Sequence, residues 1–321
     1  MEKIHTEDLK IGMYVVLPKA WFSHPFLKNE FIISSDAQIE KILVTGIRDV
    51  FVDPERSVVA EKEEALQTVI YKNRAQQPVI PPDLREAIYD RKIPPAEKAR
   101  AVQKHSITMI NRLMEEPSAE NIVEAKKGIA EVVNLILSDD KTNSYLLSLT
   151  SHDYNTYVHS VNVGVLAVSL SKKLFIKSSA HNMHELGAGF FLHDLGKVRI
   201  NLDIINKPDK LSEEEMTEMR SHPLYGYEIL RETRQLTEEC KRIVLQHHER
   251  FDGSGYPRGL RGEEIHLYGR ICSLADVYDA LNSERPYRRG LKPFDALNVM
   301  KYEMLEHFHR ELFEKFVLLF K

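Results

Sequence analysis

The β-branched and aromatic positions near the start of the chain predict a small sheet. Lys10–Leu17 has the composition of a strand, Phe31–Ser35 reads as a second strand, and Asp49–Asp53 reads as a closing strand. A short helix is expected over Asp36–Val44, because a serine that can cap its N-terminus precedes it. Residues 1–57 are therefore expected to form a small α/β domain with a regulatory or structural role.

Residues 58–146 are polar and helix-prone, with several prolines. Pro78–Pro82 is expected to be an extended linker, because each proline disfavours helix in the residue before it. One helix is expected to run from Pro95 to about Glu116. A second is expected over Ala119–Ser138, where the apolar residues recur at helical spacing. This region reads as linker and connecting helices that pack on the last domain.

Residues 147–321 show a helical pattern almost throughout. Expected helices include one from about Tyr154 to Lys173, one through Glu185–Lys197 that Gly196 is expected to end, and one over Tyr268–Leu281. Ser212 opens another with a capping-box pattern. The expected fold class is mainly α: a C-terminal helical bundle and a small α/β N-terminal domain, joined by linker helices.

Composition and charge narrow the class of protein. The 321 residues are 43% hydrophobic and 29% charged, which excludes a disordered or low-complexity chain. A net charge of -4 argues against a partner that is a nucleic-acid polymer. Two cysteines fit a reducing compartment, and no stretch approaches the ~18 apolar residues of a membrane helix. The N-terminus is charged where a signal peptide is apolar, so a cytoplasmic protein is expected.

The histidines are unevenly distributed. The chain has 14, and nine of them lie between His152 and His266. His159 shares a helical face with apolar residues, which by itself is typical of a core histidine, and His222 precedes a proline at an expected helix junction. The chemistry of this protein is therefore expected in this third of the chain.

The combined set of side chains points to a metal site. The candidate ligands are His159, His193, Asp194, His222, His247, His248 and Asp276. Imidazole and carboxylate without thiolate favour iron or manganese over a structural zinc site. Seven side chains are too many for one tetrahedral ion and suit two roughly octahedral divalent ions, which together can activate water against a phosphoryl centre.

Three motifs resemble those of the HD-GYP phosphodiesterases, a branch of the HD metallohydrolase superfamily that hydrolyses cyclic di-GMP. They are His-Asp-x-Gly-Lys from His193, His-His-Glu-x-x-Asp-Gly-x-Gly-Tyr-Pro from His247, and Asp-x-x-Asp-Ala-x-x-x-x-Arg-Pro-Tyr-Arg from Asp276. The resemblance covers about half of the chain. It implies an HD-type catalytic bundle over 147–321.

The resemblance also implies residue roles. All seven candidate ligands match the family's metal-ligand positions, with Asp194 bridging the two ions. Lys197 matches a lysine near the scissile phosphate, and Tyr256 matches a substrate-contacting position. Arg285 and Arg288 match basic positions that face phosphate or guanine, which suits the planar guanidinium. The implied reaction is attack of a metal-bridging hydroxide on phosphorus, giving 5′-pGpG and then GMP.

Two departures from the family pattern matter. Some members carry a glutamate four residues before the first histidine, which supports a third metal, and here that position is Asn155. We therefore expect two ions. Glu284 replaces the usual aspartate before Arg-Pro-Tyr, and we interpret this replacement as having no effect on function. The N-terminal region resembles the small domain of unknown function that often precedes this catalytic domain.

Two alternatives to cyclic di-GMP hydrolysis stay open at this point. One is hydrolysis of a cyclic GMP–AMP dinucleotide, because the motif residues do not separate the two substrates. The other is a signalling module that binds a cyclic dinucleotide without turning it over. A homodimer or a signalling-protein partner is also open, and no membrane partner is expected.

Overall fold

The computed structural model divides into two compact units, Met1–Pro78 and Val79–Lys321. The structure describes residues 2–17, 30–33, 38–39, 42–43, 47–54, 56–57, 78–149, 156–175, 178–207, 209–284 and 289–320.

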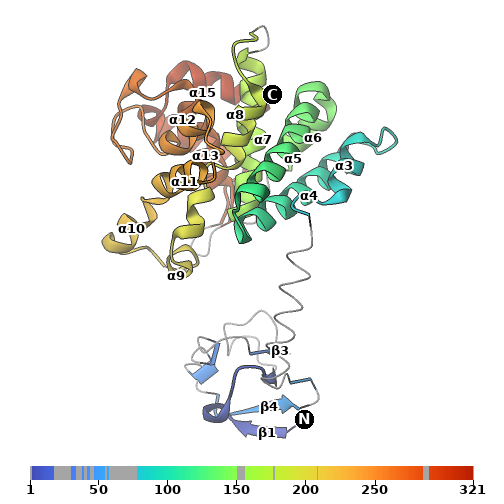
Figure 1. Cartoon of the computed structure of the whole chain (residues 1–321). Coiled ribbons are helices and arrows are strands. Elements are labelled where there is room, and N and C mark those ends of the chain that lie inside the picture. Colours follow the sequence, from blue (N-terminus) through green and yellow to red (C-terminus); the bar gives the residue numbers. More distant parts are fainter. Residues whose placement is uncertain are drawn as a thin grey trace. The chain divides into compact units, whose positions relative to one another are not determined.

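The first unit contains a four-stranded antiparallel sheet (Figure 1). Its strands are β1 (Glu2–His5), β2 (Tyr14–Val16), β3 (Glu30–Ile32) and β4 (Asp49–Asp53), in the order β1-β4-β2-β3. A short 3₁₀ turn, η1 (Thr6–Asp8), follows β1. One face of the sheet is covered by a small apolar core, which consists of Leu9, Val15, Leu17, Ile33, Ile42, Val50 and Val52.

Most strands of this sheet were predicted from the sequence. The closing strand over Asp49–Asp53 is confirmed, whereas β2 is shorter than the expected Lys10–Leu17. Strand β1 was not expected, because its four residues are largely exposed and carry no apolar pattern; pairing with β4 defines it. Of the expected helix Asp36–Val44, residues 38–39 and 42–43 are helical, and the others lie outside the described residues.

The second unit is built from helices, so the expected mainly α fold is confirmed. The helices are α3 (Pro82–Tyr89), α4 (Pro95–Glu115), α5 (Ala119–Ser138), α6 (Asp140–Ser148), α7 (Thr156–Phe175), α8 (Met183–Phe191), α9 (Leu202–Ile205), α10 (Glu213–Met219), α11 (His222–Glu232), α12 (Glu238–Gln246), α13 (Leu267–Asn282), α14 (Pro293–Tyr302) and α15 (Arg310–Val317). Short 3₁₀ segments are η2 (Leu195–Arg199), η3 (Gly262–Glu264), η4 (Leu305–His307) and η5 (Leu318–Phe320). The capping box expected at Ser212 is present at the start of α10.

Helix α7 lies at the centre of this unit. It packs against α4, α5 and α6 on one side and against α8 and α13 on the other (Figure 1). Its residues from His159 to Ser171 are all buried, although they include polar side chains such as Ser160 and Asn162. A helix buried around its whole circumference must find partners for these polar groups within the protein.

One expectation for the connecting region is wrong. Pro78–Pro82 is not an extended linker throughout, because Pro82 is the first residue of α3 and Val79 and Ile80 are buried in the core of the helical unit. Proline has no N–H to lose at the first position of a helix, so it starts α3 instead of preventing it. The expected helices α4 and α5 are confirmed, and they pack into the same core as α7 and α8.

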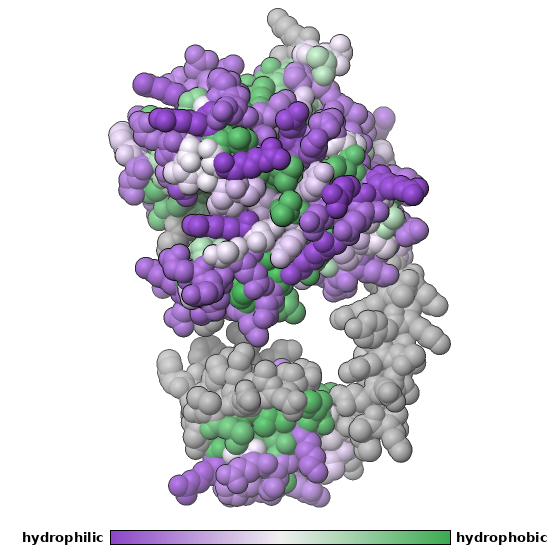
Figure 2. All heavy atoms as spheres, turned by 60° about the vertical axis from the view of Figure 1, so that its left-hand side comes forward, coloured by the Kyte–Doolittle hydropathy of each residue, from purple (hydrophilic) through white to green (hydrophobic). Residues whose placement is uncertain are grey.

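The surface of the helical unit is mostly polar. Figure 2 shows a face on which hydrophilic residues dominate and hydrophobic residues form only small patches. Among the described helices, none combines the length and apolar character needed to cross a membrane.

Candidate metal centre

Five segments of the helical unit bring the candidate ligands together. Helix α7 carries His159, the turn after α8 carries His193 and Asp194, and α11 begins at His222. His247 and His248 follow the end of α12, and Asp276 lies in α13. All these side chains are buried except that of His248, which is 24% exposed. The structure therefore gathers all seven predicted ligands.

The expected helix through Glu185–Lys197 ends earlier than predicted. Helix α8 stops at Phe191, and the chain changes to the 3₁₀ segment η2 after Asp194. Nδ1 of His193 is held by the carbonyl of Phe190 at 2.8 Å. Neighbouring residues of a continued α-helix would diverge by about 100° around its axis, and the change of conformation at this turn accompanies the approach of both side chains to the cluster.

Gly196 permits the close approach of η2 to α11. A Cβ atom at this position would collide with the carbonyl oxygen of His222 and with the backbone N of Gly226. Glycine avoids this clash, so the turn carrying Asp194 and Lys197 can lie directly against the first turn of α11. The glycine of the His-Asp-x-Gly-Lys motif thus has a packing reason.

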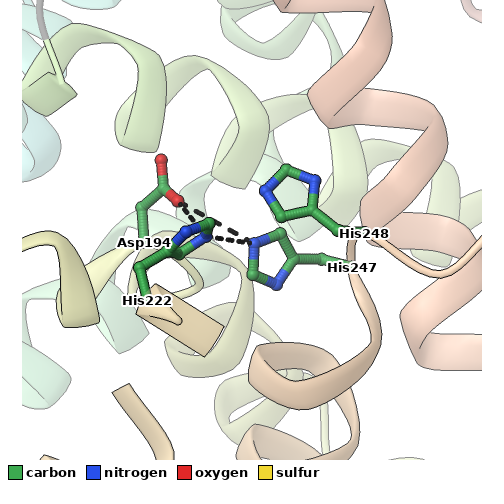
Figure 3. Close-up of side chains that lie close together, drawn as sticks. All are labelled: Asp194, His222, His247 and His248. Carbon is green, nitrogen blue, oxygen red and sulfur yellow. Dashed lines mark hydrogen bonds and ion pairs between the residues drawn. The ribbon is translucent and has the colours of Figure 1, made fainter. Parts of the chain in front are cut away.

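The carboxylate of Asp194 lies between two pairs of imidazoles. Its Oδ1 atom lies 3.2 Å from Nε2 of His222 and 3.8 Å from Nε2 of His247, and Figure 3 draws both rings together with that of His248. Its Oδ2 atom lies 3.7 Å from Nε2 of His159 and 3.5 Å from Nε2 of His193. Each carboxylate oxygen therefore faces its own pair of ring nitrogens.

Two groups of ligand atoms in this cluster have the compactness that a metal ion needs. One consists of Asp194, His222, His247 and His248, and the other of His159, His193 and Asp194. Asp276 contacts both groups, because its Oδ1 lies 3.0 Å from Nε2 of His159 and its Oδ2 lies 3.4 Å from Nδ1 of His248.

Hydrogen bonds at Nδ1 orient four of the imidazoles. A backbone carbonyl accepts from Nδ1 of His193, His222 and His247, at distances of 2.8, 2.8 and 2.9 Å. The acceptor for Nδ1 of His159 is Oδ2 of Asp279, at 2.8 Å. A carbonyl can only accept, so in His193, His222 and His247 these bonds place a proton on Nδ1 and leave Nε2 with the lone pair that binds metal.

The pKa values of the two carboxylates favour their anionic forms. Burial raises the pKa of Asp194, but Lys197, His193 and His222 outweigh it and hold that pKa well below its usual range. Burial also raises the pKa of Asp276, while the hydrogen bond with His159 and the nearby imidazoles lower it further than burial raises it.

Most of the imidazoles are favoured in their neutral form. Burial lowers the pKa of His193, and it lowers the pKa of His248 to about 3. Burial and the neighbouring imidazoles hold the pKa of His247 well below its usual range. Burial would also lower the pKa of His159, but Asp276 and Asp279 raise it well above its ordinary value. Anionic carboxylates and neutral imidazoles are the forms that bind metal ions.

Buried polar atoms without hydrogen-bond partners also support the interpretation of this cluster as a metal site. Nε2 of His193 and Oδ1 of Asp194 are buried and have no hydrogen-bond partner within the part of the chain that the structure describes. Burial of such atoms is unfavourable unless a ligand compensates for it. The donor set of imidazole and carboxylate therefore fits a divalent metal ion.

The predicted catalytic and substrate-binding residues are partly visible. Nζ of Lys197 lies 2.6 Å from Oδ2 of Asp194, and the ring of Tyr256 stacks on that of His248 with centroids 4.6 Å apart. Arg285 and Arg288 lie outside the described residues, as does Asn155.

Two residues that sequence reasoning missed support the loop that carries Tyr256. The buried carboxylate of Glu249 accepts hydrogen bonds from the backbone N–H groups of Arg258 and Leu260, at 2.8 and 2.9 Å. The exposed guanidinium of Arg220 lies 5.7 Å from the centre of the Tyr256 ring. The position of Glu249 directly after the paired histidines was a signal for the first residue, whereas no pattern in the sequence indicated the second.

Comparison with known proteins identifies the family. A family model described as HD domain matches residues 141–312, which is more than half of the chain. The chain belongs to the HD domain family. A second model, described as a domain of unknown function (DUF3391), matches residues 1–135. These matches place the chain with the HD-GYP phosphodiesterases that carry this N-terminal domain.

Individual relatives agree with this assignment. The chain is 30% identical to the cyclic di-GMP phosphodiesterase PA4108 of Pseudomonas aeruginosa over 99% of its own length and 76% of that protein. It is 42% identical to the 3'3'-cGAMP-specific phosphodiesterase 2 of Vibrio cholerae over 38% of its own length and 24% of that protein. The structure of Bd1817, an HD-GYP-type protein of Bdellovibrio bacteriovorus, has the same fold. That match has a TM-score of 0.62 and 19% identity, and covers 98% of this chain and 97% of that one.

Proposed function

We propose that this protein is a metal-dependent phosphodiesterase that hydrolyses cyclic di-GMP to 5′-pGpG and then to GMP. The observation that carries the proposal is the position of Asp194, whose two oxygens face separate pairs of imidazoles. A carboxylate placed in this way can bridge a pair of adjacent cations, and paired cations suit phosphoryl transfer. The similarity to PA4108, named a cyclic di-GMP phosphodiesterase, supports the substrate.

We propose that the site holds two divalent ions, with iron or manganese as the favoured metals. His159, His193, His222, His247, His248 and Asp276 would hold them together with the bridging Asp194. The absence of thiolate from this set supports these metals over a structural zinc. When bound, the ions supply Lewis acidity and a water molecule acidified enough to attack phosphorus near neutral pH.

The remaining roles are proposed for side chains at the edge of the cluster. Lys197, 13% exposed beside Asp194, carries a positive charge that can stabilise negative charge developing on phosphate oxygens. Tyr256, stacked on His248, offers an aromatic face to a guanine base. Arg220 adds a guanidinium at the same ring, and Arg285 and Arg288 are proposed to contact phosphate or guanine.

For the organisation of the chain we propose a small regulatory domain over 1–57, connecting helices over 58–146 and the catalytic bundle over 147–321. A homodimer or a signalling protein is the proposed partner. We propose that the protein acts in the cytoplasm, which its two free, buried cysteines support.

The test combines metal analysis with turnover. Anaerobically purified protein should contain iron or manganese and convert cyclic di-GMP to pGpG. Asp194→Ala should remove both the metal and the turnover, whereas Asp203→Ala, which changes an exposed carboxylate on α9, should remove neither. Unchanged activity of a metal-loaded Asp194→Ala protein contradicts the two-metal mechanism.

Hydrolysis of a cyclic GMP–AMP dinucleotide is the second candidate function. The observation in its favour is the 42% identity to a relative named as 3'3'-cGAMP-specific. Parallel assays with both dinucleotides at equal concentration decide between them, because the larger kcat/KM identifies the preferred substrate. A metal-loaded protein that binds cyclic di-GMP and yields no pGpG would instead indicate a non-catalytic signalling module.

A further inference from the structure

His159 differs from the other oriented imidazoles of the metal centre in what holds its Nδ1 atom. His193, His222 and His247 donate to carbonyls three residues earlier in the chain, so local backbone conformation sets their orientation. His159 is oriented by Asp279, which is 120 residues away and lies on α13. The orientation of His159 therefore depends on the packing of α7 against α13.

The two helices meet through pairs of residues three apart. On α7 these are His159 and Asn162, and on α13 they are Asp276 and Asp279, so each pair lies on one helix face. Asp279 is fully buried, and Nδ2 of Asn162 donates to its Oδ1 atom at 2.9 Å. Both carboxylate oxygens of Asp279 are therefore occupied by donors from α7.

The hydrogen bonds continue from α7 to α4. Nε2 of the partly buried Gln103 donates to Oδ1 of Asn162 at 3.2 Å and to the carbonyl of Leu149 at 3.0 Å. The hydrogen bonds between these side chains thus both point towards Asp279, because Gln103 donates to Asn162 and Asn162 donates to Asp279. Helix α4 lies within residues 1–135, the segment that matches the N-terminal family model.

We propose that Asp279 is a positioning residue for metal binding, and that Asn162 and Gln103 couple its position to helix α4. This inference rests on the proposed function, in which Nε2 of His159 is a metal ligand. Asp279 fixes the proton on Nδ1 of His159 and aims Nε2 at the cluster, as carboxylates behind metal-binding histidines do. Gln103 holds the other end of this relay, so a displacement of α4 alters the affinity of the metal centre.

The first experiment measures Mn²⁺ affinity instead of turnover. Full-length protein is stripped with a chelator, dialysed and titrated with Mn²⁺ by calorimetry. Asp279→Asn keeps the size of the side chain but offers only one acceptor oxygen to three donors, from His159, Asn162 and Ser283, and it should weaken Mn²⁺ binding about 10- to 100-fold. Asp203→Asn removes an exposed carboxylate and should leave the affinity unchanged.

Thermal melting separates positioning from a structural role. The chelated Asp279→Asn protein should retain most of the wild-type melting temperature, and the rise of that temperature on adding Mn²⁺ should shrink. Equal losses in both conditions, with wild-type Mn²⁺ affinity, overturn the positioning role.

The second experiment tests the coupling to α4. Gln103→Met cuts the relay at its half-buried end and should weaken Mn²⁺ binding about threefold to tenfold. Lys104→Met, on the exposed side of the same helix, is the control and should bind as wild type. Adding Gln103→Met to Asp279→Asn should cause no further loss, because the relay is already interrupted. Full additivity, or wild-type affinity in Gln103→Met, overturns the coupling.

These outcomes are distinguishable from failure of the proposed function. A wild-type protein that binds no Mn²⁺ and hydrolyses no cyclic dinucleotide refutes the metal centre itself. A wild-type protein that does both, beside an Asp279→Asn protein of equal affinity, refutes only the positioning role. If Asp279→Asn fails to fold, Gln103→Met still tests the relay, because its side chain is only partly buried.

Discussion

The sheet of the first unit and the histidine cluster of the second treat charge in opposite ways. In the sheet unit the buried core is apolar, and the described ion pairs Lys3–Asp49 and Arg56–Glu30 are exposed at the surface. In the bundle, imidazoles and carboxylates are buried beside the apolar core, with Asp194 only 1% exposed. Apolar burial stabilises a fold, whereas buried ionisable groups require compensation.

The comparison shows that the buried groups that cost stability lie at the candidate site. Several of the buried groups have perturbed pKa values, and Nε2 of His193 lacks a hydrogen-bond partner among the described residues. Such groupings are typical of functional sites. Substitutions in the two regions should therefore affect different properties.

The largest expected effect is the loss of turnover in His247→Ala. The substitution removes an imidazole that faces Asp194, so metal content should fall and kcat/KM should drop at least about 1,000-fold, or roughly 4 kcal/mol. His184→Ala is the matched control, because this histidine is exposed on α8. Metal analysis and dinucleotide turnover measure both variants; equal activities would contradict a role for His247 as a ligand.

A smaller, purely structural effect is expected from Ile33→Ala in the sheet unit. Ile33 is fully buried, and its truncation should destabilise that unit by about 3 kcal/mol. Hydrogen exchange should accelerate over Asp49–Asp53, while metal content and protection of α12 stay at wild-type values. Loss of metal from this variant would contradict the separation of roles.

Metal binding should stabilise the helical unit and leave the sheet unit unchanged. At 100 times its dissociation constant, an ion that binds only the folded state adds about 2.7 kcal/mol of stability. A chelator should therefore accelerate hydrogen exchange in α7, α12 and α13 and leave Asp49–Asp53 unchanged. If metal also slowed hydrogen exchange in the sheet unit, this prediction would be contradicted.

The smallest expected effect is a change in how the free energy of unfolding depends on pH in the acid range. Because the pKa of Asp276 is lowered in the folded protein, its contribution is present above the ordinary value of 3.8 and is lost as pH falls towards the lowered pKa. His159 acts in the opposite sense, because its raised pKa gives a contribution that disappears as pH rises through that pKa. In a chelator, Asp276→Asn should therefore be less stable than wild type at pH 6 and lose less stability between pH 6 and pH 3.5. Urea unfolding measures both; parallel curves would contradict the buried pairing.

Much of the architecture was predictable because it rests on local rules. The apolar spacing over Ala119–Ser138 predicted α5 with the bounds that the structure shows, and the capping-box pattern at Ser212 marked the start of α10. Errors arose where packing overrides local preference. Val79 and Ile80 are core residues in a proline-rich segment, and α8 ends before His193.

The sequence by itself determined which side chains the candidate site contains, because residue types and their motif spacings suffice to single out imidazoles and carboxylates as candidate ligands. Only the tertiary structure decided which oxygen of Asp194 faces which pair of histidines, and that Asp279 orients His159. Those relations join segments far apart in the chain. They depend on how α4, α7, α11 and α13 pack, which no local spacing specifies.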